Sequence, residues 1–116
     1  MESTIPWQEQ CAAARRLKAG LGARVAIDYL LGEKLPRFLR RADRDPSLIP
    51  EVPKFVAEIS RIFSQREVRE HMPGVRYLRA LLGVDGEEAR ELLDRMSMLL
   101  MSAYGTNVLA RRQPPS

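Results

Sequence analysis

AIDYLLGEKLPRFLRRADR, residues 26–44, is the longest segment of this chain with clean helical periodicity. Its apolar residues recur every three or four positions, so they share one side of an α-helix. The residues on this side are Ile27, Leu31, Leu35, Phe38 and Ala42. Leu30 and Leu39 widen the stripe, and a stripe this broad predicts a helix packed into a globular core rather than the narrow seam of a coiled coil.

Two residues interrupt the pattern of this helix. Pro36 has no N–H to donate to the carbonyl of Gly32, and the proline ring crowds that carbonyl. Gly32 stands where the crowding falls, and a glycine bends easily. The pair predicts either a kink within one continuous helix or a break, with Pro36 in the first turn of a second helix.

Four arginines lie on the opposite side of the same helix. They are Arg37, Arg40, Arg41 and Arg44. Arg37 can pair with Glu33 one turn earlier, whereas the other three have no acid one turn earlier. Asp43 and Asp45 are close in sequence, but we expect them past the helix end. The arginines either complement the helix dipole at its C-terminus or form a ridge that binds phosphate or an acidic protein surface.

The composition predicts a single folded domain with a modest positive charge. A chain of 116 residues, 45% of them hydrophobic, has enough apolar side chains for one core and is not disordered. Lys and Arg number 19 against 15 Asp and Glu, which gives a net charge of +4. Nucleic-acid binders usually concentrate their charge more than this.

Cys11 is the only cysteine, so an intrachain disulfide and a cysteine-rich metal site are excluded. We therefore expect a reducing, cytoplasmic compartment. The first ten residues, MESTIPWQEQ, are polar and acidic, which predicts no secretory signal. No apolar run approaches the ~20 residues that a membrane span needs, so we expect no membrane association.

Helical signals precede this central segment. Ser3 or Thr4 can cap a first helix, with Pro6 in its first turn and Gly20 near its end. The apolar face of this helix consists of Trp7, Cys11, Ala14, Leu17 and Leu21. The turn that follows is short, which predicts that the first helix lies antiparallel to the next one.

Helical signals also follow the central segment. Pro50 and Pro53 fit the start of a third helix but not its middle. Its amphipathic face consists of Val52, Phe55, Val56, Ile59, Ile62 and Phe63. Ser64 and Glu67 then form a capping box for a short helix, and residues 75–82 form another.

The last helix begins at Asp85, again with a capping box, and we expect Gly105 to be its C-cap. Its core face consists of Ala89, Leu92, Leu93, Met96, Leu99, Leu100 and Ala103. No stretch alternates at the period of a β-strand. The chain is therefore predicted to be all-α, a compact bundle of five or six helices in one domain over residues 1–110, with a mobile tail at 111–116.

Residues 64–83, SQREVREHMPGVRYLRALLG, resemble the helix-turn-helix family of DNA-binding motifs, because a helix, a tight break and a second helix follow one another. The resemblance implies that the second helix enters the major groove with Arg76, Tyr77 and Arg79 as DNA contacts. The segment departs from the motif in having no small residue in the middle of its first helix and in carrying Pro73 at the turn. The alternative is a pair of short packed helices with solvated arginines.

Residues that could carry catalysis are scarce. His71 is the only histidine, and a hydrolytic metal site normally needs several ligands. Cys11 fits the core face of the first helix as a small buried hydrophobe. The sequence has no phosphate-binding glycine loop, dinucleotide fingerprint or nucleophile elbow. We therefore predict no catalytic residue, no metal site, no cofactor and no enzymatic activity.

Met98 and Met101 fall away from the core face of the last helix, on the side of Asp94 and Ser97. The second half of this helix is thus apolar nearly all round, and such helices are buried on more than one side. Either the helix is central in the bundle, or its extra face contacts another protein or a second copy. Methionine suits such a contact because it adapts to irregular surfaces.

Two functional hypotheses follow. The first is a small non-enzymatic binding protein, an adaptor or regulator, whose Met98–Met101 face binds a partner or a second copy. The four arginines of residues 37–44 would then steer an acidic partner. The second is a DNA-binding transcriptional regulator, which needs arginines from at least two helices on one face. Exposure of both methionines in a single chain would favour the first hypothesis.

Overall fold

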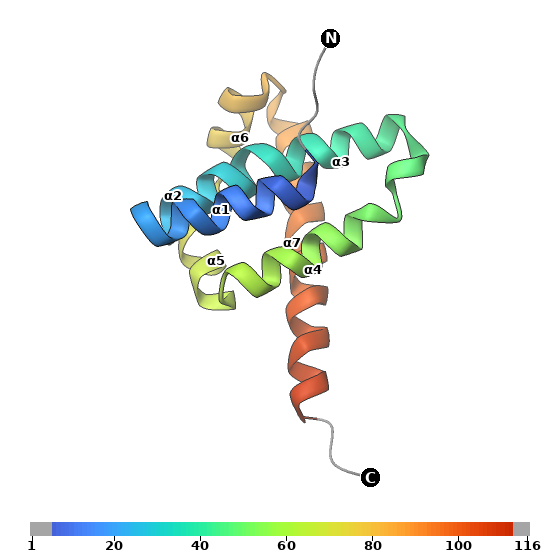
Figure 1. Ribbon diagram of the computed structural model, residues 1–116. Helices are drawn as coiled ribbons and strands as arrows, with labels where there is room; N and C mark the ends of the chain where they lie inside the picture. The colour runs from blue at the N-terminus through green and yellow to red at the C-terminus, as the bar shows by residue number, and fades with distance from the viewer. Residues whose placement is uncertain (1–5, 113–116) are drawn as a thin grey trace.

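The helix predicted over residues 26–44 is longer than expected and passes through an irregular turn (Figure 1). It consists of α2 (Ala23–Tyr29), a π-helical turn, η1 (Leu30–Lys34), and α3 (Leu35–Arg44). The amide of Leu35 donates to the carbonyl of Leu30, five residues earlier, as in a π-helix. Pro36 follows in the first turn of α3, where a missing N–H is tolerated. The predicted irregularity at Gly32–Pro36 is confirmed, and the chain stays helical through it.

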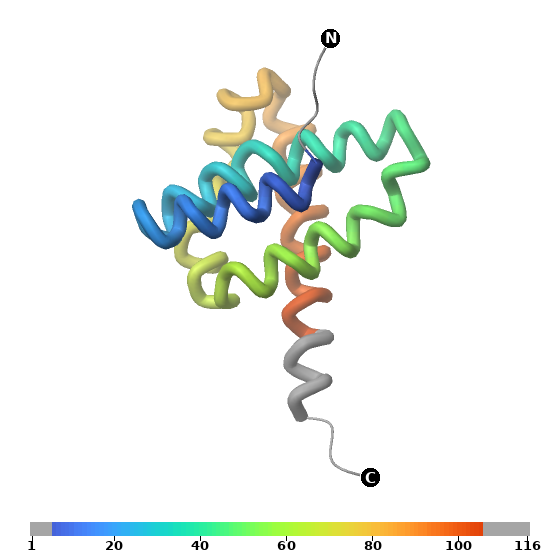
Figure 2. The backbone as a smooth tube through the Cα atoms, in the orientation of Figure 1, coloured from blue at the N-terminus to red at the C-terminus, as the bar shows by residue number. Residues whose placement is uncertain are grey.

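Five more helices complete the part of the chain that this computed structural model describes, residues 6–112 for the backbone and 6–105 for the side chains. They are α1 (Trp7–Leu21), α4 (Glu51–Ile62), α5 (Gln65–His71), α6 (Val75–Leu82) and α7 (Gly86–Arg112), with a 3-10 turn, η2 (Pro46–Leu48), before α4. Figure 2 traces their order from the blue to the red end. The predicted all-α bundle is confirmed over these residues, with six helices when residues 23–44 count as one. Among the helices described here, none is both long and apolar enough to span a membrane.

Helix α1 lies antiparallel beside α2, as the short turn between them predicted (Figure 1). Gly22 forms this turn with a φ of 99°, a backbone conformation that favours glycine. Leu21 is 67% exposed because it ends α1 at the tip of this hairpin, so its predicted place in the core is wrong. The predicted caps Ser3 and Thr4 lie outside the described residues, and Pro6 precedes the helix instead of lying in its first turn.

Helix α4 begins where its prolines predicted. Pro50 is the N-cap residue, and Pro53 lies in the first turn. The ring of Phe55 stacks on Trp7 at a centroid distance of 5.7 Å and meets the edge of Phe38 at 5.4 Å. These aromatic contacts join α1, α3 and α4 in one core.

The predicted capping boxes form to different extents. At α5, Ser64 Oγ accepts from the Glu67 amide at 3.0 Å, and Glu67 Oε1 accepts from the Ser64 amide at 2.9 Å, so the box is complete. At α7, Asp85 accepts from the Glu88 amide at 2.8 Å. The Glu88 carboxylate does not accept a hydrogen bond from the Asp85 amide, because it pairs with Arg40 of α3 at 3.1 Å.

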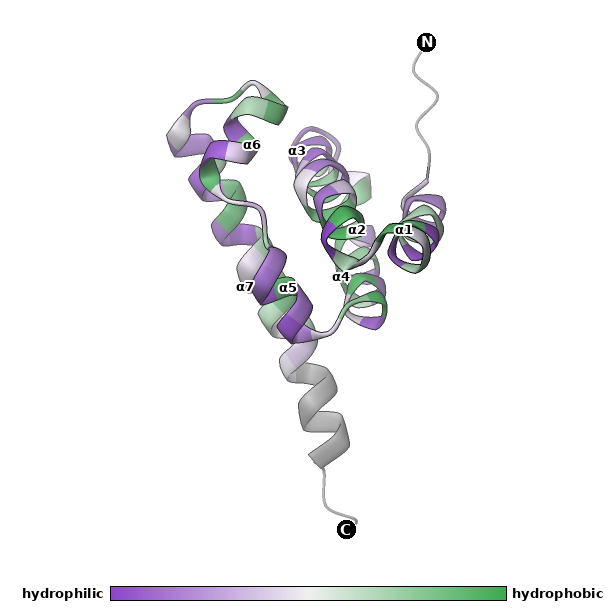
Figure 3. Ribbon diagram, turned by 90° about the vertical axis from the view of Figure 1, so that its left-hand side faces the viewer, coloured by the Kyte–Doolittle hydropathy of each residue, from purple (hydrophilic) through white to green (hydrophobic). Residues whose placement is uncertain are grey.

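Helix α7 is the axis of the bundle, and α3, α4 and α6 pack along it. In Figure 3, α7 is seen along its length at one side of α1, α2 and α4, which are seen nearly end-on. Its backbone continues through Gly105 to Arg112, so the predicted C-cap at Gly105 is wrong. The tail at 111–116 stays a prediction, since residues 113–116 lie outside the described part of the chain.

Candidate functional site: the outer face of helix α7

Helix α7 has two faces of opposite character. Its inner face is buried through Ala89, Leu92, Met96, Leu100 and Tyr104. On its outer face Met98 is 72% exposed and Met101 is 69% exposed. Two residues along an α-helix turn by about 200°, so Met96 and Met98 point to opposite sides. Both predicted partner-binding methionines therefore lie outside the core, and their binding role stays a prediction.

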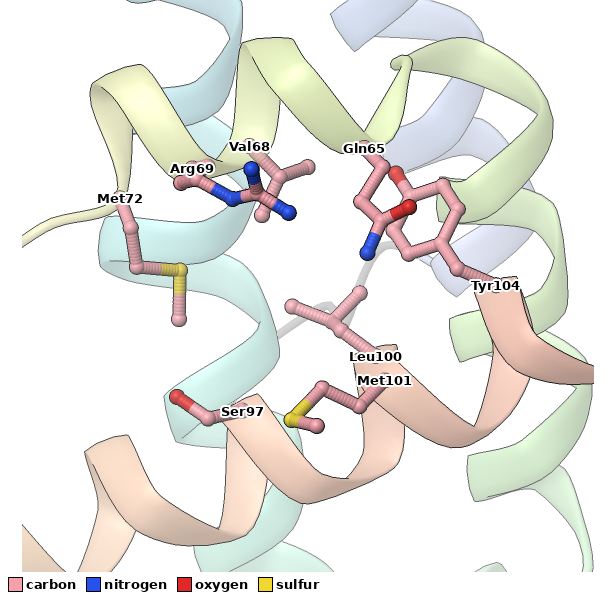
Figure 4. Close-up of a pocket in the computed structure, with 8 residues that line it drawn as sticks. All are labelled: Gln65, Val68, Arg69, Met72, Ser97, Leu100, Met101 and Tyr104. Atoms are coloured by element: carbon pink, nitrogen blue, oxygen red, sulfur yellow. The ribbon is translucent and has the colours of Figure 1, made fainter.

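A groove of about 340 Å³ separates α7 from α5 beside this outer face (Figure 4). Its lining consists of Gln65, Val68, Arg69, Met72, Ser97, Leu100, Met101 and Tyr104. Val68 and Leu100 form a buried apolar floor, and Met72 and Met101 flank it. Because Met101 belongs to both the groove and the outer face, the two surfaces are continuous.

The polar groups of the groove differ in their availability. The hydroxyl of Tyr104 donates to the carbonyl of Phe63 at 2.7 Å and is already engaged. Arg69 forms no ion pair with any residue of the described part, while the neighbouring Arg66 pairs with Glu70 at 3.0 Å. The Gln65 amide and the Arg69 guanidinium both project over the apolar floor (Figure 4). The groove therefore combines an apolar floor with one free positive charge.

The predicted arginine ridge is divided between internal contacts and solvent. Arg37 pairs with Glu33 at 3.3 Å, as predicted, and also donates to the carbonyl of Leu81 on α6. Arg40 pairs with Glu88, an acid that α7 supplies across the bundle. Only Arg41 and Arg44, exposed in the last turn of α3, form no ion pair among the described side chains.

Of the two acids expected past the end of this helix, only Asp45 lies there. Asp43 lies inside α3 rather than past its end, and both of its carboxylate oxygens accept from Arg95 of α7, at 3.0 and 3.1 Å. Asp45 does lie past the helix end, where its carboxylate accepts from the amide and the hydroxyl of Ser47. The Arg40–Glu88 and Asp43–Arg95 pairs join α3 to α7 at partly exposed positions.

The two helices of the helix-turn-helix resemblance diverge. Helix α5 packs on α2, whereas α6 packs on η1 and α7. The ring of Tyr77 lies against the π turn, where a Cβ on Gly32 would be 2.7 Å from its Cε1 atom, and Arg79 packs on Gly86. All three predicted DNA contacts, Arg76, Tyr77 and Arg79, are nevertheless exposed. DNA binding by these residues stays a prediction.

The candidate catalytic residues are far from reactive arrangements. Cys11 is buried in the core, and burial raises the pKa of its thiol to about 12. His71 lines an open cleft of about 490 Å³ with Asp28, Glu70 and Tyr77. No cluster of three or more His, Cys, Asp or Glu in the described part could hold a metal ion. The absence of enzymatic activity stays a prediction.

Sequence reasoning missed the groove, and Met101 is the only residue of its lining that was predicted as a binding residue. Tyr104 continues the Met96–Leu100 spacing by four residues, so the helical periodicity could have placed it in the core. Arg69 carries no such signal, because only the packing of α5 beside α7 brings it to the outer face.

Compared with known proteins, the chain has no match among protein-family models, curated sequences or solved structures.

Proposed function

We propose that this chain is a small non-enzymatic binding protein, an adaptor or regulator, that docks a partner protein on the outer face of α7. The observation that supports this function is the exposure of Met98 and Met101, 72% and 69%, on a helix whose other face is buried. Large exposed apolar side chains beside a groove are typical of interaction sites. Methionine fits such a surface because its flexible thioether adapts to the partner.

The positive charge of the chain has a smaller role in this proposal than the sequence indicated. Arg37 and Arg40 are engaged within the bundle, so Arg41 and Arg44 are the members of the ridge free to attract an acidic partner. Charges of this kind raise association rates more than they raise affinity. Binding energy is expected to come from the methionine face.

Site-specific photo-crosslinking in the cells that make this protein tests the proposal. A benzophenone amino acid replaces Met101 in one variant and Met98 in a second. The control carries it at Arg16, an exposed residue of α1. We expect discrete crosslinked products from positions 98 and 101, lost when the other methionine is also changed to glutamate, and none from position 16. Equal yields at all three positions, or no product from the two α7 positions, would overturn the proposal.

A further inference from the structure

We propose that the groove between α5 and α7 receives the outer face of α7 from a second copy of this chain. Met98 of each copy would fill the groove of the other, and Asp94 would pair with Arg69 across the interface. This inference rests on the proposed function and names its partner. A two-fold axis relates the copies, because a symmetric contact uses the same surface on both and forms each pairing twice.

The groove accepts an apolar side chain. Its floor is Val68 and Leu100, and Met72 and Met101 stand at its sides (Figure 4). Its volume of about 340 Å³ is at the lower end of the 300–1,000 Å³ typical of ligand sites. It is open along one side, so it suits a few side chains of a docking helix. Helix-in-groove contacts use residues that recur every three or four positions on the incoming helix.

The positive charge of Arg69 favours an occupant of the groove that carries a negative charge. Its guanidinium projects over the floor beside the Gln65 amide and has no carboxylate partner among the described side chains (Figure 4). The other charges of α5 nearby are satisfied, since Arg66 pairs with Glu70. A guanidinium binds a carboxylate through charge-assisted hydrogen bonds. The groove therefore selects a helix with an apolar side chain and an acid about one turn away.

The outer face of α7 has this combination itself. Asp94 lies four residues before Met98, which is one turn of the helix and the same face. Met98 is 72% exposed, and Asp94 is exposed and forms no ion pair within the part of the chain described. Each copy thus carries both the groove with its free cation and the helix face with its free anion. This complementarity identifies a second copy as the occupant.

Analytical ultracentrifugation of the full chain tests this proposal. We expect a reversible equilibrium between the 13.2 kDa monomer and a dimer, with dissociation in the micromolar range because the contact is small. Protein concentrations from about 1 µM to about 1 mM cover this range. Met98→Glu should abolish the dimer, since it places a charge on the apolar floor of the groove.

Charge reversal tests the Asp94–Arg69 pairing. Arg69→Asp and Asp94→Arg should each weaken dimerisation at least about tenfold, because like charges then meet at two symmetric positions. The double variant, Arg69→Asp with Asp94→Arg, should restore it, which a loss of folding could not do. Arg16→Asp is the matched control, since this exposed α1 arginine has no ion pair among the described residues.

The outcomes separate this inference from the proposed function. A chain that stays monomeric to about 1 mM while position 101 crosslinks a different protein overturns the inference and leaves the proposed function standing. A monomer with no crosslinked product overturns both. A dimer that tolerates Met98→Glu, or that the double charge reversal does not restore, uses another surface and also overturns the inference.

Discussion

Burial determines the chemistry of Cys11, the only cysteine of the chain. Its side chain is 1% exposed, and burial raises the pKa of the thiol to about 12 because an apolar environment disfavours the thiolate. The thiolate is the species that reacts with disulfide reagents. We therefore expect the folded protein to resist dithionitrobenzoate at pH 8 and to react promptly once urea unfolds it. Prompt reaction of the folded protein would contradict the buried position of this side chain.

The same burial predicts how stability depends on pH. Burial also raises the pKa of Tyr104 to about 12. A group whose pKa is raised by folding stabilises the protein below its unfolded pKa, and that contribution is lost as the pH rises toward the folded pKa. Unfolded values are about 8.5 for a thiol and about 10 for a phenol. The free energy of unfolding should therefore fall from about pH 9 toward pH 12, and Cys11→Ala should remove the earliest part of this fall. Urea titrations across this range measure it, and a flat profile would contradict both shifts.

Tyr104 forms a buried hydrogen bond at the end of α4, where its hydroxyl donates to the carbonyl of Phe63 at 2.7 Å. Tyr104→Phe removes the donor and leaves that carbonyl without it. We expect a loss of about 1–2 kcal/mol in the free energy of unfolding, measured by urea titration. The matched control is Tyr77→Phe, since Tyr77 is 41% exposed and its hydroxyl has no hydrogen bond among the described residues. Its effect should stay within about 0.5 kcal/mol, and equal effects would contradict the assigned bond.

Gly32 and the Tyr77 ring approach each other closely at the π turn of the long helix. A Cβ on Gly32 would lie 2.7 Å from the Tyr77 ring, so Gly32→Ala must displace the ring, at a cost of about 1–2 kcal/mol. In a Tyr77→Ala background the contact is gone, and alanine should then stabilise the helix by about 0.5–1 kcal/mol relative to glycine. Urea titrations of the four proteins form a double-mutant cycle. An equal cost in both backgrounds would show that the turn itself, and not the ring, requires glycine.

The same helix shows what could be predicted from sequence. All seven of its predicted core positions are buried, because apolar periodicity is local information and states directly which side of a helix faces the core. The local pattern did not show that the irregularity is a π turn. Nor could it show that α6 brings the Tyr77 ring against Gly32, because this contact joins residues far apart in the sequence. The Arg40–Glu88 pair could not be predicted either, because Glu88 reaches Arg40 only through the packing of α7 on α3.

The candidate site was also predictable only in part. The spacing along α7 was enough to place Met98 and Met101 away from the core, because both the core face and the outer face belong to one helix. The groove was not predictable, since half of its lining comes from α5 and its immediate surroundings. Arg69 was not predictable either, because only the packing of α5 beside α7 brings it to the groove, and a solvated arginine gives no such signal in a sequence.

Across the whole molecule, contacts to α7 change in kind along its length. Its first half is tied to α3 by the Arg40–Glu88 and Asp43–Arg95 ion pairs. Further along, Tyr104 ties its inner face to the end of α4, while Met98 and Met101 on its outer face are left to solvent. The bundle is therefore complete without these two methionines, and their apolar surface is available for another contact.

Met96 and Met98 provide a matched test of this division, because the same substitution at two nearby positions probes opposite faces of α7. Met96 is 0% exposed, so Met96→Ala removes buried volume and should cost about 2–4 kcal/mol at any protein concentration. Met98→Ala at about 1 µM protein should change the free energy of unfolding by no more than about 0.5 kcal/mol.

Self-association adds a dependence on concentration to this comparison. A dimer stabilises the folded chain by mass action, so urea titrations at about 200 µM should show a cost for Met98→Ala that is absent at about 1 µM. The loss of stability caused by Met96→Ala should be the same at both protein concentrations, since Met96 is buried within one chain. A large and equal cost for Met98→Ala at both concentrations would place that side chain in the core of the single chain. A cost that appears only at high concentration would identify the outer face of α7 as a surface buried between copies.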